Sequence, residues 1–244
     1  MSPARREIAS ACSGLPARLQ EVWRESATSG SAMPGEPVLA ERLAASRPAV
    51  REALIRLEER GYIRRRQGAD TVINRRMLDI TARIDEQIDR SELIASTGRA
   101  ASMVVVDNHI DTPTAEESVQ FEIPRTSTIM RTTKVWYADD EPVIRAHDCI
   151  VLRDASSASI DPAIPIFDIA AAVGTGPTEW EIVYPSATAV SARDATLLNL
   201  PKGKPALTME VVGVSRSGLT SYWASELHST NAFQHTMIRL VGRQ

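Results

Sequence analysis

The stretch SRPAVREALIRLEERGYIRRR, residues 46–66, carries arginine at seven of its 21 positions. The whole chain has 244 residues and a formal net charge of −3, so this basic stretch differs from its surroundings. An arginine-rich helix is most often a solvated face, and a surface that binds a polyanion is the rarer alternative. The elements on either side of the stretch distinguish the two.

A helix is expected over 47–60. Ser46 is a favoured N-cap residue, and Pro48 fits the first turn because the N–H that it lacks would have no helical partner there. Apolar side chains recur at helical spacing to form a stripe for the core: Val50, Leu54 and Leu57. Gly61 ends the pattern, as glycine commonly does after a helix.

The neighbouring segments complete a known motif. Further helices are expected over 15–29, ended by Gly30, and over 38–44. Beyond Gly61 the pattern becomes that of a β-hairpin, with strands at 62–66 and 71–73. Helices followed by a hairpin in this order make a winged helix-turn-helix.

Within this motif the arginines fall into three groups. Arg47 and Arg51 lie about 40° apart on the helix, on a stripe offset from the apolar one, where they can contact phosphates or read guanine. On the hairpin, Arg64 and Arg66 share one face and Arg65 lies on the other. The remaining two, Arg56 and Arg60, have acidic neighbours and are interpreted as ordinary surface charges.

Charge is distributed unevenly along the chain. Residues 1–76 hold 14 arginines and nine acidic residues, which gives +5, whereas residues 77–244 sum to −8. A basic first third on an acidic remainder indicates two domains, the first suited to nucleic acid.

Residues 77–244 predict an α/β domain. Residues 74–99 are expected to be partly helical, because Ile80, Ile84 and Ile88 recur at helical spacing within 77–93. A strand is expected at 103–106, and helices near 114–121, 165–173 and 191–199. Residues 121–145 can be laid on residues 198–222 at a constant offset of 77. Each copy reads as a helix followed by a β-hairpin, so we predict one domain built from two related halves.

Composition limits the class of protein. Hydrophobic residues make up 43%, and no apolar run is long enough to predict a membrane span. The start of the chain lacks a secretory signal pattern, and the only two cysteines, Cys12 and Cys149, form neither a disulfide framework nor a zinc motif. We therefore expect a cytoplasmic protein with no membrane partner, no metal and no cofactor.

Residues 17–73 resemble the N-terminal domain of the GntR family of bacterial transcription regulators. The resemblance rests on Ser-Arg-x-x-Val-Arg-x-Ala-Leu, Leu-Glu-x-x-Gly and Arg-Arg-x-Gly, which begin at Ser46, Leu57 and Arg65. It implies that residues of the helix start and the wing contact operator DNA: Ser46, Arg47, Pro48, Arg51, Arg64, Arg65, Arg66 and Gly68.

Two positions depart from the family pattern. Only Glu36-Pro37-Val38 separates Pro34-Gly35 from Leu39, so a helix start and a DNA-contacting arginine are expected to be missing. In the wing, Asp70 places a negative charge where phosphates are expected. Both departures imply weaker or altered DNA binding.

The stretch KVWYADDEPVI and residues 190–240 resemble the UTRA domain, the effector-binding half of HutC-type GntR regulators. The resemblance implies a chorismate lyase-like, internally duplicated fold over 77–244 and a winged helix-turn-helix over 1–76, together an α+β protein. It also implies effector contacts: Arg131, Lys134, Trp136, Tyr222, Glu226, His228 and Asn231. Where the family has two arginines, Lys134 keeps a charge without the bidentate fork and Trp136 offers only a stacking face. A sugar phosphate therefore fits less well than a more aromatic, less charged ligand.

Three functions stay open. The first is a ligand-responsive repressor that binds a double-stranded operator as a homodimer and is controlled by a small-molecule effector. The second is a chorismate lyase-like enzyme, although no general acid/base pair or nucleophile stands out in the sequence. Separately, His147 and Cys149 lie two apart on one strand and face the same side, which allows a Cys-His catalytic interpretation without a visible oxyanion loop. The third is a UTRA protein with impaired DNA binding that acts through a partner.

Overall fold

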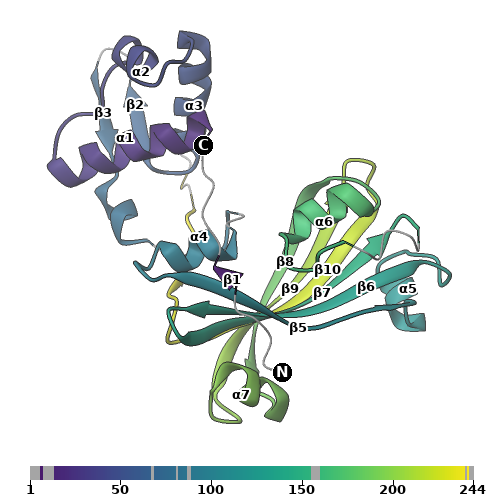
Figure 1. Cartoon of the computed structure of the whole chain (residues 1–244). Helices are drawn as coiled ribbons and strands as arrows, with labels where there is room; N and C mark the ends of the chain where they lie inside the picture. The colour runs from purple at the N-terminus through teal and green to yellow at the C-terminus, as the bar shows by residue number, and fades with distance from the viewer. Residues whose placement is uncertain are drawn as a thin grey trace. The chain divides into compact units, whose positions relative to one another are not determined.

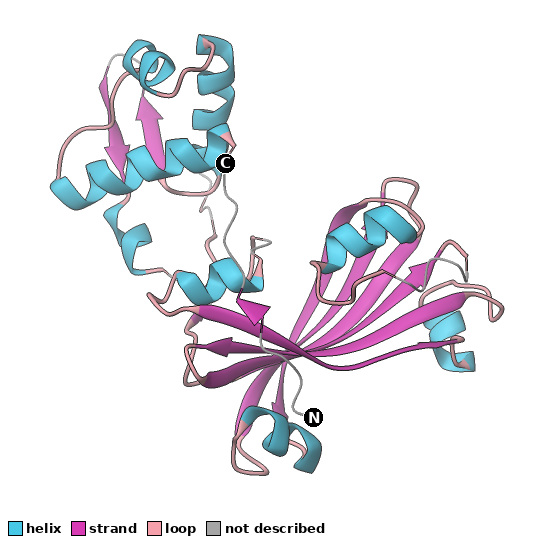
Figure 2. Cartoon of the chain, viewed as in Figure 1, coloured by secondary structure: helices cyan, strands magenta, loops and turns pink. Residues whose placement is uncertain are grey.

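The computed structural model describes residues 6–7, 14–66, 69–80, 82–86, 89–154, 160–239 and 241. The chain divides into two compact units (Figure 1): Ser10–Glu86 with His235–Gln244, and Met1–Ala9 with Gln87–Gln234. Helices dominate the first unit and strands the second (Figure 2). Among the described helices, none is long and apolar enough to cross a membrane.

The first unit is the predicted winged helix-turn-helix. Its elements are α1 (Leu15–Ser29), α2 (Glu36–Arg42), α3 (Arg47–Glu59), β2 (Ile63–Arg66) and β3 (Ala69–Ile73). Helix α1 ends at Gly30, whose φ of 78° lies in the left-handed region that glycine adopts without strain. The missing helix start is a correction: α2 does begin at Glu36, with Gly35 as an N-cap that offers no side-chain bond.

The core of this unit forms where the helices meet the hairpin. Val50, Leu54 and Leu57, the predicted stripe of α3, are buried. Trp23 of α1 packs edge-on against the Tyr62 ring at 4.8 Å and donates an indole hydrogen bond of 3.0 Å to the Tyr62 carbonyl. These contacts fix the hairpin against the helices, so the wing keeps its place beside α3.

Residues 74–99 are partly helical as expected, but the helical spacing within 77–93 does not form one continuous helix. The segment instead contains a 3₁₀ helix, η1 (Arg75–Asp79), a short strand, β4 (Ala82–Arg83), and helix α4 (Arg90–Ala95), while Ile88 lies outside the described residues. A charged side chain explains the break. Arg83 is buried, donates to the Arg60 carbonyl and pairs with Asp85 and Glu86, which anchors the segment as an extended connection.

The end of the chain returns to the first unit. Strand β11 (His235–Thr236) pairs in parallel with β4. At the other end, β1 (Arg6–Glu7) pairs with strand β5 of the second unit. The expected bounds were 1–76 and 77–244. In the structure the first residues of the chain belong to the sheet-rich unit, and the last residues belong to the helical unit.

The second unit is built on one antiparallel sheet. Within the described residues it has seven strands in the order β1-β5-β6-β7-β10-β9-β8. After β1 the strands are β5 (Ala101–Asp111), β6 (Thr128–Ala138), β7 (Glu141–Leu152), β8 (Thr178–Ala189), β9 (Pro205–Ser215) and β10 (Thr220–His228). Its helices besides α4 are α5 (Ala115–Gln120), α6 (Ile166–Val173) and α7 (Ala192–Leu198).

The sheet has the internal duplication that the sequence predicts. The succession β5-α5-β6-β7 recurs as β8-α7-β9-β10, and the two halves meet where β7 pairs with β10. Strand β6 begins 77 residues before β9, as expected. The second hairpin has the longer turn, so in β10 the match shifts by one residue: Asp148 corresponds to Glu226 rather than to Ser225.

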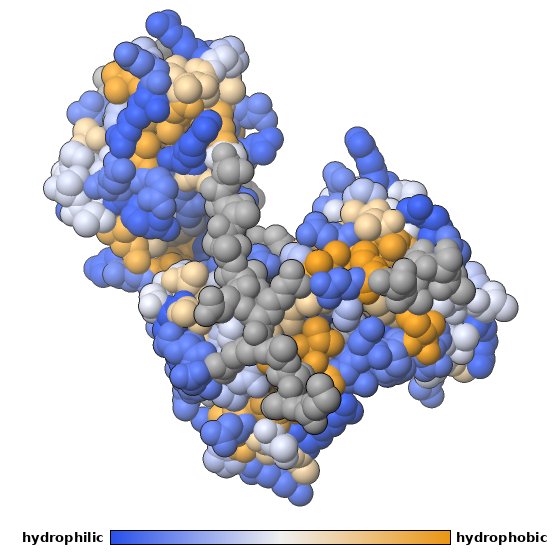
Figure 3. All heavy atoms as spheres, viewed as in Figure 1, coloured by the Kyte–Doolittle hydropathy of each residue, from blue (hydrophilic) through white to orange (hydrophobic). Residues whose placement is uncertain are grey.

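Strand register sorts the side chains onto two faces. One, the Lys134 face, also carries Asp148, Tyr222, Glu226 and His228; the other is the Cys149 face. Helices α4 and α6 lie over the Lys134 face, as contacts Arg90–Glu226 and Phe167–Tyr222 show. Helices α5 and α7 lie over the Cys149 face, as the contacts Arg131–Glu117 and Arg145–Asp194 show. Around α6, on the other face, hydrophobic residues gather at the surface (Figure 3).

Gly213 gives a direct test of this packing. A Cβ at this position would lie 2.2 Å from a Tyr222 ring carbon, while its backbone does not need glycine. We expect Gly213→Ala to destabilise the protein by about 1–3 kcal/mol because the buried ring has nowhere to move. In a Tyr222→Leu background the same change should cost much less; equal costs in urea unfolding would contradict the contact.

Candidate functional site

The start of α3 presents the predicted DNA-contacting residues to solvent. Ser46, Arg47, Pro48 and Arg51 are all exposed. The Ser46 hydroxyl caps the helix by accepting a 3.3 Å hydrogen bond from the Ala49 N–H. Arg47 makes no ion pair within the described part of the chain, so its guanidinium is available for a phosphate or a base edge.

Arg51, in contrast, is engaged by an acid. Its Nη2 donates to Oε2 of Glu36, the first residue of α2, at 2.9 Å, and its Nε donates to Oε1 of the same carboxylate at 3.3 Å. This bidentate pair lowers the pKa of Glu36. Glu36 belongs to the short segment that departs from the family pattern, so that departure adds an acidic partner to a recognition-helix arginine.

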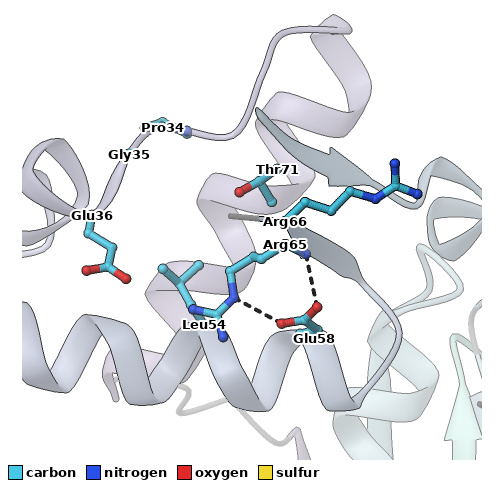
Figure 4. A pocket seen from close by; sticks show the side chains of 8 residues that line it. All are labelled: Pro34, Gly35, Glu36, Leu54, Glu58, Arg65, Arg66 and Thr71. Atoms are coloured by element: carbon cyan, nitrogen blue, oxygen red, sulfur yellow. Dashed lines mark hydrogen bonds and ion pairs between the residues drawn. The ribbon is translucent and has the colours of Figure 1, made fainter. Parts of the chain in front are cut away.

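A groove lies between the start of α2, α3 and the wing (Figure 4). Its volume is about 450 Å³, and Glu36, Glu58 and Arg65 line it. Glu58 accepts from both the Arg65 backbone N–H and the Arg65 Nε, each at 3.0 Å, and these bonds lower its pKa. These bonds hold Arg65 against α3. This agrees with the prediction that Arg65 lies on the hairpin face opposite Arg64 and Arg66.

The wing exposes the other two arginines. Arg64 has 73% of its side chain exposed and approaches Glu58 only to 3.9 Å. Arg66 is exposed as well and extends away from the groove (Figure 4). Asp70 is exposed on β3 close to them in sequence, while the predicted contact Gly68 and the first cysteine, Cys12, lie outside the described residues.

In the second unit, Lys134 is buried with an acidic partner that sequence reasoning missed. Its side chain is 2% exposed, and Nζ lies 3.4 Å from Oδ2 of Asp148 and 3.4 Å from the Ile164 carbonyl. Burial lowers the pKa of Lys134, while Asp148 opposes that shift. The other carboxylate oxygen of Asp148, Oδ1, is buried without a hydrogen-bond partner among the described residues.

Glu226 carries a second buried ion pair on the same face. It pairs with Arg90 of α4 and accepts a hydrogen bond of 2.8 Å from His228 Nε2. Burial, with Arg90 and Arg145 nearby, lowers the pKa of His228 to about 3, so its ring is neutral and Nε2 is the donor. The Arg90 guanidinium also lies over the Trp136 ring, 5.4 Å from its centroid.

Tyr222 adds an aromatic wall beside these pairs. It is fully buried, packs edge-on against Phe167 of α6 at 5.9 Å, and its hydroxyl bonds Glu181 of β8. Five of the seven predicted effector residues therefore lie on one covered face: Lys134, Trp136, Tyr222, Glu226 and His228. Here they are called the Lys134 cluster, together with their partners Asp148, Arg90 and Glu181.

Two predicted effector residues do not join this cluster. Arg131 lies on the Cys149 face, where Glu117 of α5 holds it through bonds of 2.7 and 2.8 Å. Arg131 lies three residues before Lys134 on β6. Side chains alternate along a strand, so the two side chains point to opposite faces of the sheet. Asn231 is exposed in the turn after β10.

The His147–Cys149 pair has the predicted shared face but not the properties of a nucleophile. Cys149 is buried, and burial raises the pKa of its thiol to about 12 despite the Arg131 guanidinium 3.2 Å away. His147 faces the Thr133 hydroxyl at 3.1 Å instead. A thiol that stays protonated at neutral pH is a poor nucleophile.

Comparison with known families agrees with both units. Residues 96–234 match the UTRA domain, and residues 19–73 match "Bacterial regulatory proteins, gntR family". The chain belongs to the GntR family. It is a transcription regulator with a UTRA effector-binding domain, and the two matches fall within the ranges in which the sequence resembles these two modules.

Solved structures share the fold of this chain. A possible transcriptional regulator, YydK from Bacillus subtilis, is 14% identical with a TM-score of 0.63, covering 91% of this chain and 99% of that one. PhnF from Mycobacterium smegmatis is 17% identical with a TM-score of 0.58, covering 94% of this chain and 100% of that one. No curated protein sequence matches the chain.

The Glu36–Arg51 pair predicts a change in the regulator's DNA affinity. Replacing Glu36 with glutamine removes the partner that competes with DNA phosphates for Arg51, so we expect about two- to fivefold tighter binding. Fluorescence anisotropy with DNA flanking the gene measures it. Glu41→Gln, an equal charge change on the exposed side of α2, is the control; equal gains in both variants would contradict a specific effect of the pair.

The Glu117–Arg131 pair predicts acid sensitivity. The Arg131 guanidinium, with bonds from Thr114, lowers the Glu117 pKa from 4.5 to about 2. A lowered folded-state pKa contributes stability that is present above pH 4.5 and lost as pH falls toward 2, on the order of 3 kcal/mol. Urea unfolding across this range should show a shallower loss in Glu117→Gln than in wild type or in the exposed control Glu116→Gln.

Proposed function

We propose that the chain is a ligand-responsive repressor whose homodimer binds an operator through α3 and the wing. The observation that carries the proposal is the Lys134 cluster, a buried set of charges in the domain that follows a DNA-binding unit. Buried ion pairs seldom add net stability, so a cluster of them covered by two helices fits a ligand site better than a structural core.

The charges of the cluster indicate the class of effector. Its two cations, Lys134 and Arg90, already have acidic partners in Asp148 and Glu226. An anionic ligand would have to displace those carboxylates. The unpartnered Oδ1 of Asp148 instead favours a ligand that donates a hydrogen bond, and Trp136 and Tyr222 offer it aromatic surface. We infer a polar effector bearing hydroxyl or amino groups, without a phosphate.

Regulation requires that the effector bind more tightly to one arrangement of the DNA-binding domains than to another. A ligand with equal affinity for both arrangements would leave operator binding unchanged. We propose that the effector favours the arrangement that does not fit the operator half-sites. In a symmetric dimer the distance between the two DNA-binding domains must match the spacing of the operator half-sites. A change in their arrangement therefore weakens operator binding.

Operator binding is tested through the recognition helix. Arg47→Ala with Arg51→Ala should weaken binding at least about a hundredfold while leaving circular dichroism and unfolding unchanged, because both side chains are exposed. The matched control is Arg24→Ala with Arg56→Ala, two exposed arginines that pair with acids on their own helices. Binding in gel shifts that survives in the test variant contradicts a DNA-reading role for α3.

We infer that the dimer forms at strand β8. This strand ends the sheet, and three of its large hydrophobic side chains are about half exposed on the Cys149 face: Trp180, Ile182 and Tyr184. Unpaired edge strands with apolar side chains readily pair with another chain.

Mass measurement tests this interface. Light scattering should give twice the 26.7 kDa chain mass for the wild type, and a monomer for Ile182→Glu. Val119→Glu changes another exposed apolar residue, on α5, and should remain dimeric. A dimeric Ile182→Glu protein would place the interface elsewhere.

A further inference from the structure

The Cys149 face holds a second, separate cavity of about 270 Å³. Strands β6, β7 and β10 form its floor, with Thr133, His147 and Ser225, and α7 forms a wall with Arg193 and Asp194. Its floor residues alternate along their strands with Lys134, Asp148 and Glu226, which point to the other side. The cavity is therefore distinct from the Lys134 cluster, with the sheet between them.

One arginine in this cavity is fixed by the protein. Arg145 has 14% of its side chain exposed, bonds Asp194 through Nε at 3.0 Å and donates to the Ser225 carbonyl at 2.7 Å. These bonds hold the guanidinium at the cavity wall. Because Asp194 neutralises it, Arg145 contributes orientation and hydrogen-bond donors more than net charge.

A second arginine adds positive charge. Arg193 lines the same cavity, is exposed, and makes no ion pair or hydrogen bond within the described residues. The residues that line the cavity thus carry two guanidinium groups against one carboxylate, and Glu210, which accepts a 2.8 Å hydrogen bond from the Ser225 hydroxyl, is a second acid beside the floor. The remaining lining residues are Thr133, His147, Ser225 and the apolar Leu197.

The surroundings of the cavity shift the pKa of its histidine, His147. Burial lowers the pKa of His147, and so do the surrounding arginines, while Asp148 opposes them. The charged groups around the ring are Arg145, Asp148, Arg131, Arg193 and Asp194, with Glu210 bonded to Ser225 and Asp107 paired with Thr133 on the neighbouring strands. His147 Nδ1 contacts the Thr133 hydroxyl, so a neutral ring and two hydroxyl groups add hydrogen-bonding capacity.

We propose that this cavity binds a small oxyanion, a phosphate or a carboxylate, between Arg193, Arg145 and His147. An oxyanion matches the planar donors of the two guanidinium groups, of which Arg193 has no acidic partner within the described residues. The volume fits a ligand of few heavy atoms, since drug-sized ligands occupy larger pockets. Such a site would let the regulator sense a small anion in addition to the effector of the Lys134 cluster.

The test follows the His147 ring by NMR in the full-length protein. Its resonance is identified by its absence in His147→Asn. Inorganic phosphate, acetate and sodium chloride are added separately at equal ionic strength, and the His147 pKa is measured in each. Phosphate or acetate should raise this pKa well above its value in sodium chloride, because a bound anion stabilises the imidazolium. The salt that raises the pKa identifies the oxyanion as a phosphate or a carboxylate.

Two variants complete the test. Arg193→Gln should weaken the affinity of the responding anion about tenfold, whereas Arg216→Gln, an equal charge change in the exposed β9–β10 turn, should leave it unchanged. Equal shifts with all three salts, or equal losses in both variants, would overturn the proposal. Because the readout is a ring in this cavity, failure here leaves the operator and effector proposals untouched.

Discussion

The antiparallel pairing of β7 with β10 is the contact on which the sheet domain depends. It joins the two related halves, and its register places Ala146 opposite Glu226 and Ala224 opposite Asp148. The two acids thus occupy corresponding positions on one face, two strand positions apart. Their small neighbours leave room for the cations that neutralise them.

The halves have diverged in how they supply those cations. Asp148 receives Lys134 from its own hairpin, whereas the position that corresponds to Lys134 in the second half is Val211. Glu226 pairs instead with Arg90 of α4. A symmetric scaffold therefore carries an asymmetric charged cluster, which suits recognition of a ligand that itself lacks symmetry.

In the DNA-binding unit, helix caps could be predicted well from sequence because they are local. Gly30, the Ser46 N-cap and Gly61 bound helices where the structure has them. Partners distant in sequence could not be found this way. The Glu36–Arg51 pair depends on how α2 packs on α3, and the break after Asp79 depends on Arg83 reaching Arg60.

The sheet shows the same division. The repeat predicted the hairpins, but the alternation of side chains makes face assignment sensitive to a single residue, so Arg131 was grouped with Lys134 although they face opposite ways. Asp148 and Glu181 escaped notice because a lone acid in a strand gives no pattern. Only the pairing of strands brings them beside Lys134 and Tyr222.

The most direct test of the account combines both domains. Operator affinity is measured with and without a metabolite that stabilises the wild-type protein in a thermal-shift screen, in the wild type and in Asp148→Asn. The account predicts that the metabolite weakens wild-type binding, and that Asp148→Asn keeps its ligand-free affinity but loses most of this response. A full response in Asp148→Asn would contradict the assignment of the Lys134 cluster as the effector site.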